Sequence, residues 1–369
     1  MNRFAKLFEL LSDDIDCALI TSDINRRYFT GMKSSAGIIA AFREKSYLII
    51  DFRYIEKARK TVTSAEVIEH KDLISQLKSL LTKHHAKNIV IESENMTVKE
   101  LSIYRTKLNE FNICDDNRLS SAVNSLRAVK DADEIECIKK AQRIAESAFD
   151  ELLDFIKVGV TEREIALKLD FLMLSKGAEA LSFDTIALAG KNTSMPHGVP
   201  SDKKVEDGEF VLLDFGAVYN GYHSDMTRTI CVGRPSEEMT KIYNIVLEAQ
   251  QAALDAAKAG ITGSQLDFAA RNIIEDYGYG DCFGHSLGHG VGMEIHEFPN
   301  ASPKSTAVLK PNEIITIEPG IYIPEKFGVR IEDFVILTEN SCENMTKCAK
   351  KYNIFIIFFT KGIAKSVKM

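Results

Sequence analysis

Short apolar runs alternate with amphipathic stretches along the first part of the chain. An apolar run bounded by turn residues predicts a strand, and apolar residues spaced three and four positions apart predict a helix. Strands are predicted at residues 17–21, 36–42, 46–50 and 88–91. Helices are predicted at residues 4–11, 54–61, 72–84 and 98–109. This alternation predicts a small α/β domain of its own over residues 1–125.

A polar, turn-rich segment follows, and we interpret residues 115–125 (DDNRLSSAVNS) as a linker. A long charged helix is predicted to begin near Asp131 and to continue to Phe155, opening a second domain over residues 126–350. Residues 351–369 stay unassigned. Their apolar run at 354–359 fits an extra edge strand guarded by lysines, and it also fits an apolar patch for a partner.

The second domain contains an internal repeat. Residues 157–161 (KVGVT) resemble residues 258–262 (KAGIT), and a helical pattern closed by glycine follows each of them. Further along, residues 209–216 (EFVLLDFG) resemble residues 313–320 (EIITIEPG). Two similar halves predict pseudo-twofold symmetry. Asp214 and Glu318 then stand at equivalent strand ends, and His197 and His296 precede them at similar distances.

A hairpin is predicted at residues 214–225 (DFGAVYNGYHSD), because Asn220-Gly221 is the strongest short-range signal for a two-residue turn. With this turn, Asp214 faces Thr227. Residues two apart on a strand share a face, so Asp214 and Asp225 become diagonal neighbours on one face. Two converging carboxylates repel, so either one is protonated or a cation lies between them.

Three other segments carry candidate chemistry. Residues 284–292 (GHSLGHGVG) place His285 and His289 among four glycines, which oppose a helix and permit close backbone approach. Residues 329–333 (VRIED) are interpreted as a strand with Arg330 and Glu332 on one face. Residues 196–198 (PHG) form a turn that carries His197.

Carboxylates dominate the candidate ligands. The set is Asp214, Asp225, His289, Glu318 and Glu332. Such oxygen-rich sites with one nitrogen suit Mn²⁺, with Co²⁺, Fe²⁺ or Zn²⁺ as alternatives. Four acids exceed the needs of one catalytic zinc, which takes three protein ligands. They fit two divalent metal ions about 3.5–4 Å apart with a bridging hydroxide.

Composition excludes some partners. The net charge is −7 and the pI is about 5.7, unlike the basic footprint of a nucleic-acid-binding protein. Seven cysteines without CxxC spacing indicate free thiols in a reducing compartment. The N-terminus lacks the apolar run of a signal peptide, and no run reaches the length of a membrane span, about 20 residues. We therefore expect a cytoplasmic protein with no nucleic-acid or membrane partner.

Four motifs together resemble the pita-bread metallopeptidase family: LDFG…HSDMTRT, HSLGHGVGMEIHE, TIEPGIYIP and GVRIED. This family includes methionine aminopeptidase, Xaa-Pro aminopeptidase, prolidase and the non-metal creatinase. The resemblance covers residues 1 to about 350 and is nearest to bacterial Xaa-Pro peptidases. It implies an α+β fold, with a pita-bread catalytic domain preceded by a smaller creatinase/prolidase-like α/β domain.

The resemblance also implies individual roles. Asp214 would bind one metal and Asp225 would bridge both. His289 and Glu318 would share a single metal, while Glu332 would bridge. The resemblance implies that His197 and His296 hold the scissile carbonyl and that Glu318 also acts as general acid/base. Substrate-binding residues on the proline side would be His285, Arg330 and Tyr322.

The implied activity is hydrolysis of the peptide bond before proline, with attack by the hydroxide that bridges two metals. The substrate would be a peptide with proline at the second position, and a homodimer is implied. Methionine aminopeptidase lacks the first domain, and creatinase has lost the ligands that all stand here. Two alternatives stay open: a non-catalytic peptide-binding protein, and another C–N hydrolase on the same fold.

Overall fold

The computed structural model describes residues 2–350, so the unassigned segment 351–369 lies outside the described residues. Two compact units divide the chain. The first is Met1–Arg127 and the second begins at Ala128. Within the described residues, no helix combines the length and the apolar character needed to cross a bilayer.

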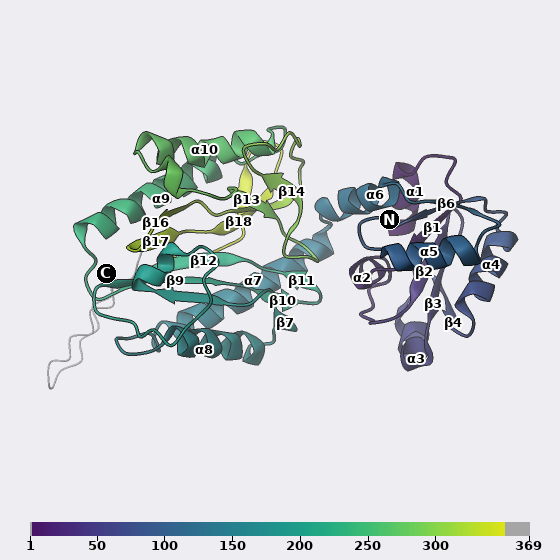
Figure 1. Ribbon diagram of the computed structural model, residues 1–369, viewed down its shortest axis with the longest axis horizontal. Helices are drawn as coiled ribbons and strands as arrows, with labels where there is room; N and C mark the ends of the chain where they lie inside the picture. The colour runs from purple at the N-terminus through teal and green to yellow at the C-terminus, as the bar shows by residue number, and fades with distance from the viewer. Residues whose placement is uncertain (1, 351–369) are drawn as a thin grey trace. The chain divides into compact units, whose positions relative to one another are not determined.

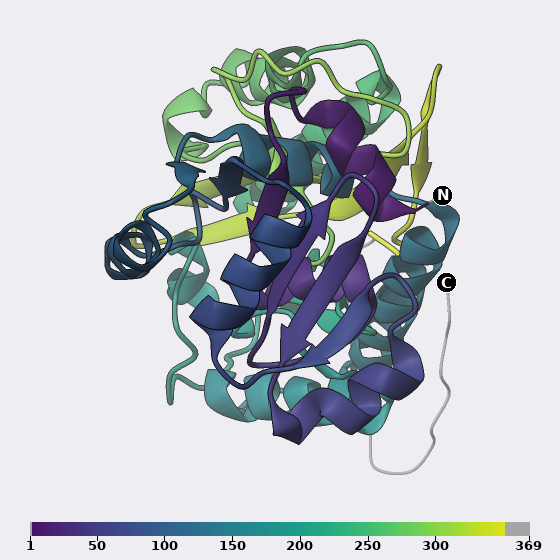
Figure 2. The same cartoon turned by 90° about the vertical axis from the view of Figure 1, so that its right-hand side faces the viewer.

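The first unit is built on a six-stranded sheet in the order β4-β3-β2-β1-β5-β6. Its strands are β1 (Cys17–Ile20), β2 (Ile38–Phe42), β3 (Ser46–Ile50), β4 (Glu66–Glu69), β5 (Asn88–Ile91) and β6 (Asn112–Cys114). Its helices are α1 (Arg3–Leu10), α2 (Asp23–Thr30), α3 (Phe52–Thr61), α4 (Leu73–Lys83), α5 (Val98–Lys107) and α6 (Arg118–Ala128). Strands β1, β2 and β3 are buried along their whole length, as expected where helices cover both faces of a sheet. The strands of this sheet, purple to blue, are seen in Figure 2.

The predicted strands and helices of this unit are all present, with ends that move by one or two residues. Helix α2 and strands β4 and β6 were not predicted. The predicted linker at 115–125 is wrong, because α6 begins at Arg118. Leu119, Ala122 and Val123 recur at helical spacing and are buried, while the polar residues between them mask this pattern.

The second unit contains two similar halves. The first half has α7 (Ala132–Leu152), α8 (Glu162–Ser175), β7 (Ala180–Leu181), β8 (Ile186–Ala189), the 3₁₀-helix η1 (Gly190–Ser194), β9 (Glu209–Phe215), β10 (Ala217–Tyr219), β11 (Tyr222–His223) and β12 (Met226–Val232). The second half has α9 (Glu237–Ala256), α10 (Gly263–Asp276), the 3₁₀-helix η2 (Gly280–Cys282), β13 (Gly288–Gly290), β14 (Glu297–Ala301), β15 (Ile314–Ile317), β16 (Gly320–Ile323), β17 (Phe327–Arg330), β18 (Asp333–Leu337) and β19 (Cys342–Asn344). Within this unit, Figure 1 shows the strands between α7 and α8 on one side and α9 and α10 on the other.

The predicted repeat is present in the structure. Thr161 and Thr262 cap α8 and α10 with the same capping box. Gly177 and Gly278 end these helices at φ of +102° and +82°, a region that favours glycine. One apolar core lies between α7, α8 and the β8–β9–β12 sheet of the first half. The other lies between α9, α10 and the strands around β15, and it also includes Phe210 of β9 and Cys231 of β12. Apolar side chains therefore also join the two halves.

The strand predicted at 329–333 is interrupted in the structure. Strand β17 ends at Arg330 and β18 begins at Asp333. Between them the chain leaves the two-stranded β16–β17 sheet for the five-stranded sheet that contains β18. The Glu332 N–H donates to Thr227 O at 3.1 Å instead of to a strand partner. This break brings Glu332 beside strand β12 of the other half.

Candidate metal centre

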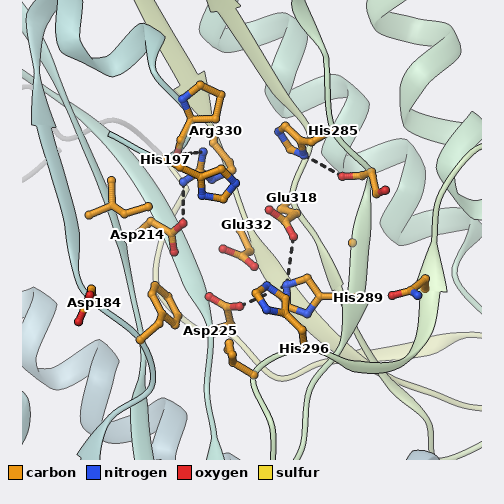
Figure 3. Close-up of a pocket in the computed structure, with 17 residues that line it drawn as sticks. Asp184, His197, Asp214, Asp225, His285, His289, His296, Glu318, Arg330 and Glu332 are labelled. Carbon is orange, nitrogen blue, oxygen red and sulfur yellow. Dashed lines mark hydrogen bonds and ion pairs between the residues drawn. The ribbon is translucent and has the colours of Figure 1, made fainter. Parts of the chain in front are cut away.

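A cavity of about 470 Å³ lies in the second unit, and residues of both halves line it. Ten of the polar residues around it are labelled in Figure 3. Every residue that the sequence proposes as a metal ligand is among the lining residues. They are Asp214, Asp225, His289, Glu318 and Glu332. The fold thus brings together side chains that are far apart in the chain.

The hairpin that carries the two aspartates has the predicted register. Tyr219 pairs with Tyr222, and Asp214 pairs with Thr227. Asn220 and Gly221 have φ of +49° and +85°, as a tight two-residue turn requires. Both aspartates consequently project into the cavity (Figure 3).

The imidazole of His289 is oriented by the backbone of its own strand. Its Nδ1 lies 3.1 Å from Gly290 O, and a carbonyl can only accept, so Nδ1 carries the proton. In the neutral ring, Nε2 therefore exposes a lone pair. This atom lies 3.4 Å from Glu318 Oε1 and 3.6 Å from Asp225 Oδ2. A lone pair facing two carboxylates is the arrangement that a cation between them would stabilise.

The three nearest ligand groups come from both halves. Ligand atoms of Asp225, His289 and Glu332 all lie within 4.8 Å of one another. Asp214 and Glu318 line the same cavity, and Glu318 also lies close to His289. Arg330 Nη2 holds Asp214 Oδ2 at 2.6 Å, and Thr316 Oγ1 donates to Glu318 Oε1 at 3.1 Å.

The acids retain buried oxygens that fit a metal ion. Asp214 Oδ1 and Glu332 Oε1 are buried and have no hydrogen-bond partner among the described residues. The other oxygen of each acid is fixed, to Arg330 for Asp214 and to Thr227 at 2.8 Å for Glu332. Buried polar atoms are rarely left without a partner, and these two oxygens belong to residues that line the cavity, where a cation could bind them. The donor set therefore fits divalent cations.

Burial and mutual repulsion raise the pKa values of three of the acids. Burial, then the charges of Asp214 and Glu318, raises the pKa of Asp225 well above its ordinary value. Burial, then the charge of Asp225, does the same to the pKa of Glu332. The pKa of Glu318 rises to about 8, chiefly because the side chain is buried. Burial lowers the pKa of His289 to about 4, so this imidazole is neutral at pH 7, as a metal ligand must be.

The proposed substrate residues lie on or behind the cavity wall. His197, His285, His296 and Arg330 line it, and Tyr322 stands behind. Arg330 Nη1 donates to Tyr322 Oη at 2.6 Å. Tyr322 Oη lies 3.0 Å from Nε2 of His285, whose Nδ1 lies 2.8 Å from Ser286 O. Arg330, Tyr322 and His285 thus form one hydrogen-bonded chain.

Two threonines that support the acids were missed by sequence reasoning. Thr227 donates to Glu332 and accepts from Arg330 Nε at 3.0 Å. Thr316 donates to Glu318 and accepts from His289 N at 3.0 Å. The alternation of strand faces could have found both, since each threonine lies two positions from a predicted ligand, Asp225 or Glu318. Phe183, Asp184 and Asn300 also line the cavity without having been predicted.

Fold and site together define a metal-dependent hydrolase with the pita-bread architecture. Known families agree with this class. Residues 136–339 match metallopeptidase family M24, and residues 3–129 match the creatinase/prolidase N-terminal domain. The chain belongs to metallopeptidase family M24, and a creatinase/prolidase N-terminal domain precedes its catalytic domain.

Similar proteins span nearly the whole chain. An uncharacterised peptidase, YqhT of Bacillus subtilis, is 43% identical, covering 95% of this chain and 98% of its own. A Xaa-Pro dipeptidase of Pyrococcus furiosus is 42% identical, with coverage of 95% and 99%. Among solved structures, a Xaa-Pro dipeptidase from Bacillus anthracis superposes with a TM-score of 0.92 at 40% identity, covering 95% and 99%. An X-Pro aminopeptidase from Thermotoga maritima superposes with a TM-score of 0.87 at 40% identity, covering 94% and 98%.

The raised pKa of Glu318 predicts how the metal-free protein responds to pH. The pKa of this carboxyl rises from its ordinary value of 4.5 to about 8 in the fold. Between these two pH values the carboxyl is ionised in the unfolded chain but protonated in the folded protein. The folded state then binds more protons, so this group lowers the free energy of unfolding as pH rises through that window. We expect the melting temperature of chelator-treated protein to fall more steeply between about pH 5 and pH 8 than that of Glu318→Gln. Equal slopes in scanning calorimetry would contradict the raised pKa.

Proposed function

We propose that this metallopeptidase hydrolyses the peptide bond before proline and releases the N-terminal residue. Two divalent ions, with Mn²⁺ as first choice, would be held by Asp214, Asp225, His289, Glu318 and Glu332. The observation that carries the proposal is the convergence of four carboxylates in one cavity with the lone pair of His289. Asp225 and Glu332 are buried, and one oxygen each of Asp214 and Glu332 is buried without a hydrogen-bond partner within residues 2–350. Relatives that bear the names Xaa-Pro dipeptidase and X-Pro aminopeptidase support the choice of bond.

When bound, divalent ions would supply Lewis acidity, which activates both a water nucleophile and the scissile carbonyl. The protein's side chains would then stabilise the developing negative charge and transfer the proton. His197 and His296 would donate ring N–H groups to the carbonyl oxygen as negative charge develops there. Burial, then the neighbouring His197, lowers the pKa of His296, so this ring is neutral at pH 7. It can therefore donate an N–H without carrying a positive charge.

Glu318 is the candidate for proton transfer. Thr316 occupies one of its carboxylate oxygens and leaves the other available. Its pKa of about 8 in the metal-free fold shows that the site favours a protonated carboxyl, and bound cations would lower this value. Glu318 would take a proton from the attacking water and deliver it to the proline nitrogen as the C–N bond breaks. The nitrogen needs this proton, because without it the proline nitrogen would have to leave as a strongly basic anion.

His285 and Arg330 are proposed to lie on the proline side of the substrate, with Tyr322 in a supporting position. Burial, then the charge of Arg330, lowers the pKa of His285 to about 4, so it presents a neutral ring at pH 7. Tyr322 is buried and is held between Arg330 and His285. A neutral imidazole is a better neighbour for the apolar proline ring than a charged side chain would be.

Substitution Asp225→Asn is expected to abolish hydrolysis of Xaa-Pro substrates while leaving the fold intact. The amide keeps the shape of the side chain but removes one of the anionic ligands in the closest group. We expect kcat/KM to fall by at least about 10³-fold, as removal of a group on which the chemistry depends does. Circular dichroism and melting temperature would verify folding. The exposed Asp276→Asn serves as control, and full activity in Asp225→Asn would exclude the two-metal mechanism.

A comparison of three substrates tests the proposed specificity. We expect wild-type protein with Mn²⁺ to cleave Ala-Pro, Ala-Pro-Ala or both, with kcat/KM at least about tenfold above that for Ala-Leu. The ratio between the first two distinguishes a dipeptidase from an aminopeptidase. Equal or faster turnover of Ala-Leu would contradict the specificity for proline and favour another C–N hydrolase. Binding of all three without turnover would favour the peptide-binding alternative.

A further inference from the structure

A buried carboxylate lies at the start of helix α8, outside the cavity. Glu162 is the first residue of this helix, and its side chain is 0% exposed. It does not line the cavity and is not one of the proposed ligands. Removing a carboxylate from water costs free energy unless its oxygens accept hydrogen bonds. The burial of Glu162 therefore has to be compensated by hydrogen bonds inside the protein.

Four hydrogen bonds satisfy Glu162, and they come from two separate places in the chain. Oε1 accepts from Ala189 N at 2.7 Å and from Asn192 Nδ2 at 2.9 Å. Oε2 accepts from Ser201 N at 2.9 Å and from Ser201 Oγ at 2.5 Å. One carboxylate thus joins both ends of the segment 189–201.

The charge of Glu162 is balanced by donors and not by a cation. Within residues 2–350 it makes no ion pair. The four donors are charge-assisted hydrogen bonds, which are stronger than bonds between neutral groups. The N-terminus of α8 also favours a negative charge at this position. A neutral replacement would lose both contributions and would leave some of the donors unpaired.

The segment that Glu162 joins carries His197 to the cavity. Between its two ends, the Thr193 Oγ1 accepts from Gly328 N at 2.8 Å, and Pro196 O accepts from Arg330 Nη1 at 3.4 Å. His197 follows Pro196 in a turn and lines the cavity (Figure 3). The position of this imidazole therefore depends on how firmly the segment is held at its ends.

The other half of the repeat achieves the same contact without a carboxylate. Gly263 stands where Glu162 stands, directly after the capping threonine of α10. A Cβ atom at Gly263 would lie 2.1 Å from Asn300 O, so the segment after His296 packs directly on the helix start. In the first half, the carboxylate of Glu162 instead bonds to Ala189 and Ser201. The carboxylate after the capping threonine is thus a feature of the first half, where it holds the segment that carries His197.

We propose that Glu162 is a positioning residue that fixes His197 for catalysis. The proposal rests on the role assigned to His197 under the proposed function. An imidazole that donates to a developing charge must be held closely, and a displacement of about 1 Å can cost about 10²-fold in rate. Two anchors on one rigid carboxylate restrict that displacement more than either anchor alone.

A double-mutant cycle tests the proposal, with Mn²⁺-loaded protein and an Xaa-Pro peptide as substrate. Glu162→Gln keeps the shape of the side chain but has one acceptor oxygen, so one anchor is lost. We expect kcat to fall about tenfold or more in Glu162→Gln and about 10²-fold in His197→Ala. In the double variant, Glu162→Gln should cost less than about twofold beyond His197→Ala, because the residue that it positions is gone. Bound Mn²⁺ should stay at the wild-type level throughout.

Glu164→Gln is the matched control, since Glu164 is an exposed residue of the same helix turn and glutamine also completes a capping box. It should keep wild-type kcat. Equal losses from Glu162→Gln in the presence and absence of His197 would overturn the positioning role, because general damage to the fold acts in both backgrounds. Wild-type kcat in Glu162→Gln would overturn it too. Wild-type kcat in His197→Ala would instead remove the role of His197 itself, and with it the positioning role.

Discussion

Repulsion among four carboxylates that share one cavity is the constraint on which the site in the second unit depends. Asp214, Asp225, Glu318 and Glu332 share one cavity, where Arg330 is the one arginine or lysine among the described lining residues. Arg330 is already bonded to Asp214. Without further positive charge, the site responds by raising the pKa of three of these acids. Divalent cations would make the same arrangement favourable, and the unpartnered oxygens of Asp214 and Glu332 would then have partners.

The fold meets this constraint by fixing one side-chain atom of four of the five proposed ligands and leaving another atom available. Thr227, Thr316, Arg330 and the carbonyl of Gly290 each hold one atom of a proposed ligand. These contacts orient the remaining atoms toward the cavity, as outer-layer partners do in metal sites. The internal repeat makes the arrangement possible, because it places one carboxylate at the equivalent strand end of each half, and both Asp214 and Glu318 line the cavity. In the role proposed for it, Glu162 would act similarly on His197, holding the segment that carries this histidine to the cavity.

Much of the site could be predicted from short sequence motifs. Asn220-Gly221 determined the register that places Asp214 opposite Thr227, and the echo of residues 209–216 at 313–320 related Asp214 to Glu318. The helix at residues 118–128 was missed because its buried positions are separated by polar residues that also suit a linker. Glu162 could not be recognised from sequence. Its four donors come from positions up to 39 residues away, and an acid after a helix cap normally faces solvent.

Counting bound ions tests the central claim most directly. Purified protein would be stripped with chelator, reconstituted with Mn²⁺, separated from free ion and analysed by mass spectrometry for manganese per chain. The account predicts about two ions per chain, since four acids and one imidazole suit a two-metal site. A chain that retains no ion, after reconstitution with Mn²⁺ or with Co²⁺, Fe²⁺ or Zn²⁺, would contradict it.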